Sequence, residues 1–197
     1  MLELTIGKMT TPQHSDDLIL LKRIAMQEEE ALSVLYSRHG DKLYGYALRI
    51  VHNPALAEDV LQESLLAIWQ GAKRFRKEGQ VLAWMFGIVH KKAMRTFRQK
   101  PTSQLDESTK DPAILEHQVD ERLLSEQRGD RLHAGLESLS VEHRTVLELV
   151  FYQDMKIKEV AEICDIPVGT VKSRLKYAKD ALKGAISRQS SSVEEIK

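Results

Sequence analysis

The sequence has 197 residues, of which 42% are hydrophobic, and its 29 basic residues balance its 29 acidic ones. This composition is typical of one large or two small folded domains, and the zero net charge gives no overall indication of a nucleic-acid partner. No apolar run approaches a membrane span and the N-terminus lacks the layout of a signal peptide, so we expect a cytoplasmic protein with no membrane insertion.

Helical spacing of apolar residues dominates the N-terminal half, where glycine, proline and alternating strand patterns are sparse. Residues 1–14 are expected to form a loose tail, after which the Ser and Asp residues at 15–17 offer caps for a helix that begins near Leu18. The next helix, from about Leu32, is predicted to bury one stripe formed by Leu35, Tyr36, Leu43, Ala47 and Ile50.

Two further helices are predicted in this half. The pair Asn53-Pro54 breaks the preceding helix and starts another that runs to about Trp69. The segment 73–81 has the composition of a loop, and the last helix follows over 82–98. Its apolar face is expected to be formed by Met85, Val89 and Ala93.

The character of the chain changes over residues 101–126, which carry seven acids and only two bases. Such a composition is typical of a linker, and helical periodicity returns after it. We therefore predict an all-α protein with two small helical domains, joined by a flexible acidic linker over 101–126. The expected boundaries are 15–100 and 127–187 for the domains, with tails over 1–14 and 188–197.

The C-terminal domain ends in a pattern typical of a helix-turn-helix. A short helix buries Val160 and Ala161, and the chain then turns at Asp165, a residue type that tolerates left-handed backbone better than most. In the second helix one buried face comprises Val171, Leu175, Ala178 and Leu182, and the opposite face carries Ser173, Lys176 and Tyr177.

Positive charge is concentrated on this second helix. Residues 168–188 hold six bases and one acid, although the whole chain is neutral. A solvated amphipathic helix is the ordinary explanation for such charges. Together with the helix-turn-helix pattern, however, the excess of cations favours a recognition helix that lies against DNA phosphates and reaches base edges in the major groove.

Two stretches of the sequence resemble a known family. LSVEHRTVLELVFYQDMKIKEVAEICDIPVGTVKSRLKYAKDAL, residues 139–182, is similar to the fourth conserved region of bacterial RNA polymerase sigma factors, especially the extracytoplasmic-function (ECF) group. ALSVLYSRHGDKLYGYALRIVHNPALAEDVLQESLLAIWQ, residues 31–70, resembles the second conserved region of that group, with AEDVLQE as the core of its polymerase-binding helix. The resemblance covers about residues 17–186.

The resemblance implies a dissociable subunit of RNA polymerase that directs the enzyme to specific promoters. Its expected partners are core RNA polymerase (the clamp and the flap of the large subunits), promoter DNA and a cognate anti-sigma factor. The helix-turn-helix would bind the −35 element and the N-terminal domain would recognise and melt the −10 element. The resemblance assigns −35 contacts to Thr170, Lys172, Ser173, Arg174, Lys176, Tyr177 and Lys179.

The AEDVLQE helix presents a polar face. Asp59, Gln62 and Glu63 fall at helical spacing, while Val60 turns towards the core. On spacing alone an ordinary solvated face explains this pattern, and only the family resemblance implies that the face docks on the polymerase clamp. The residues expected to bind core polymerase are Asp59, Val60, Gln62 and Glu63.

A basic stripe follows on the helix over 82–98. Lys91, Arg95 and Arg98 fall at i, i+4 and i+7, a spacing that can follow a phosphate backbone. Trp84, Phe86 and Phe97 offer apolar and stacking surface nearby, although aromatic residues at helical spacing are more often core residues. The resemblance places the preceding loop where relatives capture a flipped base. The residues expected to contact the −10 region are Arg76, Lys77, Gln80, Trp84, Lys91, Lys92, Arg95 and Arg98.

Two alternatives from other classes explain less of the sequence. An enzyme would need a site around His90 or another histidine, but the chain has no zinc-binding His pair with a glutamate, no Gly-rich phosphate loop and no Gly-x-Ser-x-Gly. A stand-alone helix-turn-helix regulator leaves AEDVLQE and the basic stripe unexplained. The lone Cys164 excludes an internal disulfide and multi-cysteine zinc sites, and is expected to be a small core residue; no metal or other cofactor is expected.

Overall fold

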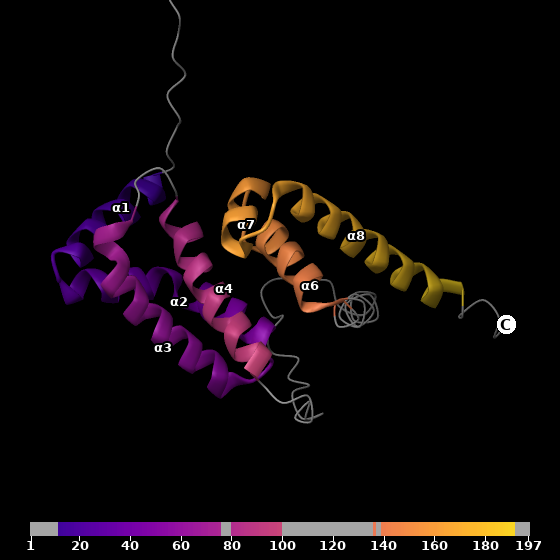
Figure 1. Cartoon of the computed structure of the whole chain (residues 1–197), viewed down its shortest axis with the longest axis horizontal. Helices are drawn as coiled ribbons and strands as arrows, with labels where there is room; N and C mark the ends of the chain where they lie inside the picture. Colours follow the sequence, from indigo (N-terminus) through magenta and orange to yellow (C-terminus); the bar gives the residue numbers. More distant parts are fainter. Residues whose placement is uncertain (1–11, 76–79, 100–135, 137–138, 192–197) are drawn as a thin grey trace, which may run out of the picture. The chain divides into compact units, whose positions relative to one another are not determined.

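The computed structural model describes residues 12–75, 80–99, 136 and 139–191, and those residues contain helices and no strands. They form two compact helical units (Figure 1), one built from α1 to α4 and the other from α6 to α8. The prediction of an all-α protein with two helical domains is confirmed. The predicted linker over 101–126 and the start of the second domain lie outside the described residues.

The N-terminal unit consists of α1 (Pro12–Ala25), α2 (Glu29–Val51), α3 (Pro54–Gly71), a 3₁₀ turn (Ala72–Arg74) and α4 (Val81–Gln99). Helix α2 packs against both α1 and α3, and α4 lies beside α3 (Figure 1). None of the helices in the described part of the chain is long and apolar enough to cross a membrane.

The core of the N-terminal unit is centred on Tyr46 of α2, whose side chain is fully buried. Its ring meets Phe86 of α4 edge to face at 5.1 Å between centroids, and its hydroxyl forms a hydrogen bond of 2.9 Å with His90 Nδ1. The phenol therefore fixes α4 on α2 by apolar and polar contacts together. Other residues of this unit with no exposed surface include Ile24, Leu35, Leu43, Ala47, Ile68, Met85, Val89 and Ala93.

The predicted break between α2 and α3 is confirmed in detail. His52 ends α2 in the left-handed conformation, and Asn53 caps α3 by accepting a hydrogen bond of 3.0 Å from the Leu56 N–H. Pro54 occupies the first turn of α3, where its missing N–H costs nothing. The prediction that Tyr36 belongs to the buried stripe of α2 is wrong, because this side chain is 46% exposed.

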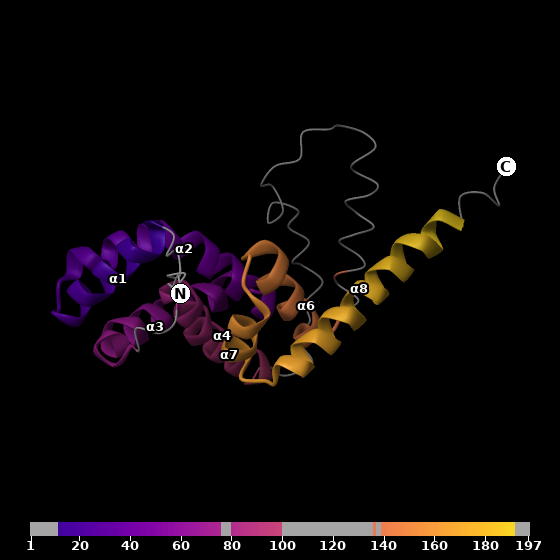
Figure 2. The ribbon, with the colours of Figure 1, turned by 90° about the horizontal axis from the view of Figure 1, so that it is seen from above.

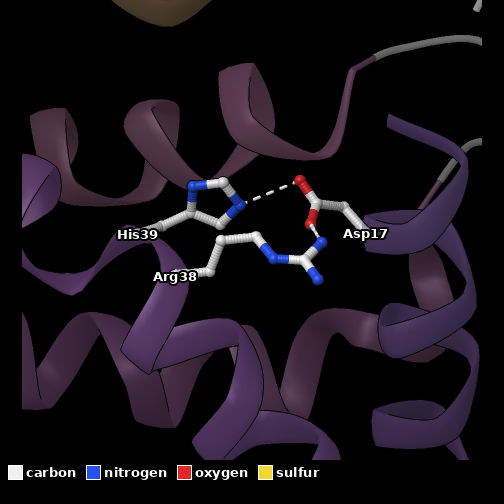
Figure 3. A network of polar contacts seen from close by, with 3 residues as sticks. All are labelled: Asp17, Arg38 and His39. Atoms are coloured by element: carbon white, nitrogen blue, oxygen red, sulfur yellow. Dashed lines mark hydrogen bonds and ion pairs between the residues drawn. The ribbon is translucent and has the colours of Figure 1, made fainter. Parts of the chain in front are cut away.

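The first helix differs from the prediction. It begins at Pro12 rather than near Leu18, and Asp17 lies inside it as a buried side chain instead of a cap. The carboxylate accepts hydrogen bonds from Arg38 Nη1 at 2.6 Å and from His39 Nε2 at 2.8 Å (Figure 3). Burial by itself would raise the pKa of Asp17, but the bonds and charges of His39 and Arg38 outweigh it and hold that pKa below its usual value. This network fastens α1 to α2.

Asp17→Ala is expected to destabilise the N-terminal unit by about 3 kcal/mol, because it leaves Arg38 and His39 without their carboxylate. For a domain of this size that is a fall in melting temperature of more than about 10 °C. Fluorescence-detected unfolding measures it selectively, since both tryptophans, Trp69 and Trp84, lie in this unit. The control is Asp16→Ala, which alters an exposed neighbour on the same helix.

The pH dependence of this difference provides a second check. A carboxyl group whose pKa is lowered by folding stabilises the folded state at pH values above its ordinary pKa. This stabilisation is lost as the pH falls through the pKa of the folded state. The gap in melting temperature between the wild type and Asp17→Ala should therefore shrink below about pH 4. A constant gap from neutral to acid pH would mean that Asp17 contributes packing rather than charge.

The C-terminal unit consists of α6 (Val141–Leu147), a π-helical turn (Glu148–Tyr152), α7 (Ile157–Cys164) and α8 (Val168–Ser191). Helix α8 packs against both α6 and α7 and continues well beyond the end of α6 (Figures 1 and 2). The core of the unit comprises Leu139, Val146, Leu149, Met155, Val160, Ile163, Val171 and Ala178.

Candidate nucleic-acid and protein interfaces

Helix α3 presents the predicted polar face to solvent. Asp59, Gln62 and Glu63 are exposed, and Ile68 on the other side of the helix is fully buried. Val60 is only 2% exposed, so its side chain can support this face from beneath but cannot present itself to a partner. We call Asp59, Gln62 and Glu63 the acidic face of α3.

Helix α4 carries the predicted basic stripe on its solvent side. Lys91, Arg95 and Arg98 are exposed, and the apolar residues opposite them, including Val89 and Ala93, are fully buried. The three cations lie at the spacing of successive helical turns. We call Lys91, Arg95 and Arg98 the basic stripe of α4.

An ion pair connects these two surfaces. Lys92 Nζ of α4 donates a hydrogen bond of 2.9 Å to Glu63 Oε2 of α3. This bond and the charge of Lys92 lower the pKa of Glu63, with a smaller contribution from the charge of Arg95. Lys92, which the sequence assigns to DNA, is therefore paired within the protein, whereas Lys91 projects from α4 into solvent.

The side chains around the loop before α4 are only partly described. Arg76 and Lys77 lie outside the described residues, and Gln80 is exposed. Trp84 is half-buried, meets Phe75 edge to face at 5.2 Å and covers Gly71, where a Cβ would lie 3.2 Å from the indole. The prediction that Phe86 offers stacking surface is wrong, because this ring is fully buried against Tyr46.

The turn between α7 and α8 has the geometry that the sequence predicts. Asp165 ends α7 with φ of 55° and ψ of 48°, in the left-handed region. The Ile166 N–H returns to the Ala161 carbonyl at 3.0 Å, which closes the helix end. At the other end of α7 the Glu159 carboxylate accepts a hydrogen bond of 2.8 Å from the Lys156 N–H.

The outward face of α8 is confirmed as solvent-exposed. Val171, Leu175 and Ala178 are buried against the rest of the unit, and Leu182 is half-buried. The predicted residues that project into solvent are Lys172, Ser173, Lys176, Tyr177 and Lys179, and Thr170 is half-buried. Most of the residues assigned to the −35 element therefore lie on one accessible surface, which we call the outer face of α8.

Arg174 departs from this pattern. It is half-buried, and its charge contributes to the lowered pKa of Glu142, which is due mainly to hydrogen bonds with the Glu142 backbone and Ser140. The same charge acts on Cys164, where burial nevertheless raises the thiol pKa to about 11. Arg174 therefore faces α6 and α7, and Cys164 stays protonated as a packed thiol of low reactivity.

Two residues outside α8 contact its exposed side chains and have no signal in the sequence pattern. The ring of His143 in α6 lies 4.4 Å from the ring of Tyr177, with 32° between their planes. Lys179 Nζ lies 4.9 Å from the ring centroid of Phe151, which is 56% exposed. Spacing along one helix cannot reveal such pairs, because they depend on how α6 and α8 cross.

Comparisons with known proteins agree with this arrangement. The sigma-70 region 2 family matches residues 35–101, and the sigma-70 region 4 family matches residues 129–182. The ECF RNA polymerase sigma factor SigL of Mycobacterium tuberculosis (strain H37Rv) is 31% identical over 160 residues, which cover 81% of this chain and 90% of SigL. The chain belongs to the ECF sigma factors.

Other relatives extend the match over more of this sigma factor. SigK of Mycobacterium ulcerans, also an ECF RNA polymerase sigma factor, is 29% identical over 178 residues, covering 88% of this chain and 94% of SigK. Among solved structures, CnrH in complex with the cytosolic domain of CnrY has a TM-score of 0.65 at 21% identity, covering 88% of this chain and 98% of CnrH. The sigma factor RpoE of Bartonella quintana, in complex with the anti-sigma factor NepR, has a TM-score of 0.58 at 22% identity, covering 74% and 90%. These two structures share the fold.

Family membership decides between the functional classes. This sigma factor is a promoter-specific transcription initiation factor, and its family consists of such factors rather than enzymes. A stand-alone helix-turn-helix regulator is not favoured, because it would leave the region 2 match over 35–101 without a role. The described residues contain no group of three or more His, Cys, Asp or Glu side chains that could hold a metal ion.

Proposed function

We propose that three helices of this sigma factor have separate binding functions. The acidic face of α3 binds the clamp of core RNA polymerase, α4 with its preceding loop contacts the −10 element, and α8 is the recognition helix for the −35 element. The corresponding domains are residues 15–100 and 127–187 by sequence, with the correction that α1 already begins at Pro12 and α8 continues to Ser191, inside the predicted tails. The observation that carries the proposal is that each helix buries an apolar side in its own unit and presents its charged side to solvent.

The acidic face of α3 suits a basic protein surface. Its two carboxylates and one amide are held on a regular helix whose opposite side is packed, so the backbone presents the face in a fixed orientation, and Glu63 has to exchange its exposed partner Lys92 for a cation of the polymerase. Preorganised charges of this kind steer a partner and fix its register. Val60 contributes by packing under the face rather than by touching the polymerase.

The basic stripe of α4 suits single-stranded or melting DNA. Its three exposed cations can contact successive phosphates, and the half-buried Trp84 lies on the same helix, where a flat ring can stack on a base. The family resemblance implies that other members of the group commonly carry Asn and Asp at the positions of Lys91 and Arg95. The −10 sequence recognised by this chain is therefore expected to differ from theirs.

The outer face of α8 suits base recognition in the major groove. We expect Ser173→Ala and Lys176→Ala to change the preference among −35 variants, by about 1–3 kcal/mol for each lost base contact. Lys183→Ala, nearer the end of the helix, should weaken binding to all DNA sequences alike and reduce the salt dependence of the affinity. Binding of the complete polymerase complex to a library of −35 variants tests both. Identical profiles for the three variants would contradict the assignment of this face to base recognition.

We also propose that this sigma factor has two protein partners in the cytoplasm, core RNA polymerase and an anti-sigma factor. Support comes from the RpoE relative of the same fold, which was solved with its anti-sigma factor. Large apolar side chains exposed on the N-terminal unit would add buried area to such a protein interface: Ile19, Val34, Tyr36 and Leu66.

A further inference from the structure

Two exposed side chains of α8 are supported from outside the helix. Tyr177 and Lys179 precede and follow the buried Ala178 in sequence, so their side chains project from α8 on either side of its packed face. Each meets an aromatic ring from the segment that precedes the helix-turn-helix. Tyr177 lies on His143 at 4.4 Å, and Lys179 Nζ lies 4.9 Å from the ring centroid of Phe151.

The supporting rings are themselves held by the fold. His143 lies in the first turn of α6, where its Nδ1 shares a hydrogen bond of 2.7 Å with the hydroxyl of Ser140, the capping residue of that helix. Phe151 lies in the π-helical turn, two residues after the buried Leu149. A phenylalanine that is 56% exposed contributes little to a core, and its contact with Lys179 gives it another role.

We propose that His143 and Phe151 are positioning residues for promoter recognition. His143 holds the Tyr177 ring in one orientation towards the base edges, and Phe151 holds the Lys179 ammonium beside a phosphate. Both roles rest on the proposed function of α8 as the −35 recognition helix. Without the rings, Tyr177 and Lys179 would have to lose rotamer freedom when they bind DNA, and affinity would fall.

The His143 role is tested with the full chain bound to core polymerase, on −35 variants. His143→Ala should reduce discrimination at the position contacted by Tyr177 by roughly two- to tenfold, the usual range for one aromatic pair. His143→Phe, which keeps a ring on Tyr177, should restore it. In a Tyr177→Ala background, His143→Ala should have no further effect, and an equal loss in both backgrounds would overturn the role.

The Phe151 role requires a different readout, because the loss of a phosphate contact weakens binding to all promoter sequences alike. Phe151→Leu keeps apolar volume but removes the ring face, and should lower affinity for every promoter variant by roughly two- to fivefold. Phe151→Tyr should retain full affinity. If Phe151→Leu causes the same loss in a Lys179→Ala background, the ring acts elsewhere and this role is wrong.

Ser173→Ala and Lys176→Ala separate a failure of this inference from a failure of the proposed function. If these two alter promoter preference while His143→Ala and Phe151→Leu do not, α8 remains the recognition helix and only the positioning roles are overturned. If none of the four alters promoter binding, the assignment of α8 itself is wrong. Melting temperatures of all variants identify any loss that is due to unfolding.

Discussion

Reversing both charges of the acidic face of α3, with Asp59→Lys and Glu63→Lys together, is expected to weaken binding to core RNA polymerase by roughly 100-fold or more. Like charges brought together at an interface cost several kcal/mol, and each 1.4 kcal/mol is tenfold in affinity. Both residues are exposed, so the melting temperature followed by tryptophan fluorescence should change little. Titration of labelled sigma factor with core polymerase measures the affinity.

A matched control separates the effect of these two positions from the effect of the changed net charge. Glu30→Lys with Asp41→Lys reverses two other exposed acids, both on α2 and outside the AEDVLQE segment, and changes the net charge by the same amount. The control should bind core polymerase nearly as well as the wild type. Equal affinities for the control pair and the Asp59 and Glu63 pair would show that the acidic face is an ordinary solvated surface.

Without polymerase, this sigma factor is expected to bind promoter DNA weakly at physiological salt, and core polymerase should raise its affinity by roughly 10²–10⁴-fold. With three exposed cations on the basic stripe of α4 and three on the outer face of α8, each surface would neutralise only a few phosphates, and such contacts weaken steeply as salt rises. Core polymerase would hold both at promoter spacing, which converts two weak contacts into one bivalent contact. Fluorescence anisotropy of a labelled promoter over a salt series, with and without core, measures the difference.

The acidic segment over 101–126 should contribute to this dependence, on the evidence of its sequence. Its acids can compete with DNA for the two basic surfaces of the free chain, so replacing the acids over 106–121 with Ser or Asn should raise the free protein's affinity for DNA. Footprints on the promoter provide the check. Protection of both elements by the free wild-type protein would mean that neither masking nor bivalency operates.

Features that depend on local periodicity and turn chemistry could be predicted from the sequence. The buried face of α8 follows from the spacing of Val171, Leu175 and Ala178, which any packed helix imposes. The Asn53 cap and the left-handed Asp165 follow from residue types that satisfy or tolerate those backbone conformations. The functions proposed for these surfaces come from the family resemblance rather than from the periodicity.

Features that depend on how helices cross could not be predicted in this way. Asp17 matches the pattern of a cap, but its place opposite Arg38 and His39 makes it a buried link between α1 and α2. Arg174 and Lys176 are both basic residues of one helix, but Arg174 lies three residues after Val171 and four before Ala178, at the edge of the buried face, and its charge acts on groups of α6 and α7. A charge pattern counts such cations equally, although their surroundings differ.

The same limit applies to contacts between the functional surfaces. Glu63 and Lys92 belong to two different predicted sites, and their ion pair requires α3 and α4 to lie side by side. The contact of His143 with Tyr177 joins residues 34 positions apart in the sequence. Such pairs carry no periodic signal, because the distance along the chain is set by the intervening loops.

Transcription reconstituted from purified components shows directly whether this chain guides core polymerase to promoters. Core polymerase alone, core with the wild-type chain and core with the Asp59→Lys, Glu63→Lys variant are compared on genomic DNA, and the 5′ ends of the transcripts are mapped. We expect only the wild-type chain to produce defined start sites, each preceded by a shared pair of −35 and −10 sequences. Transcription that starts at the same positions with or without the chain would contradict this expectation.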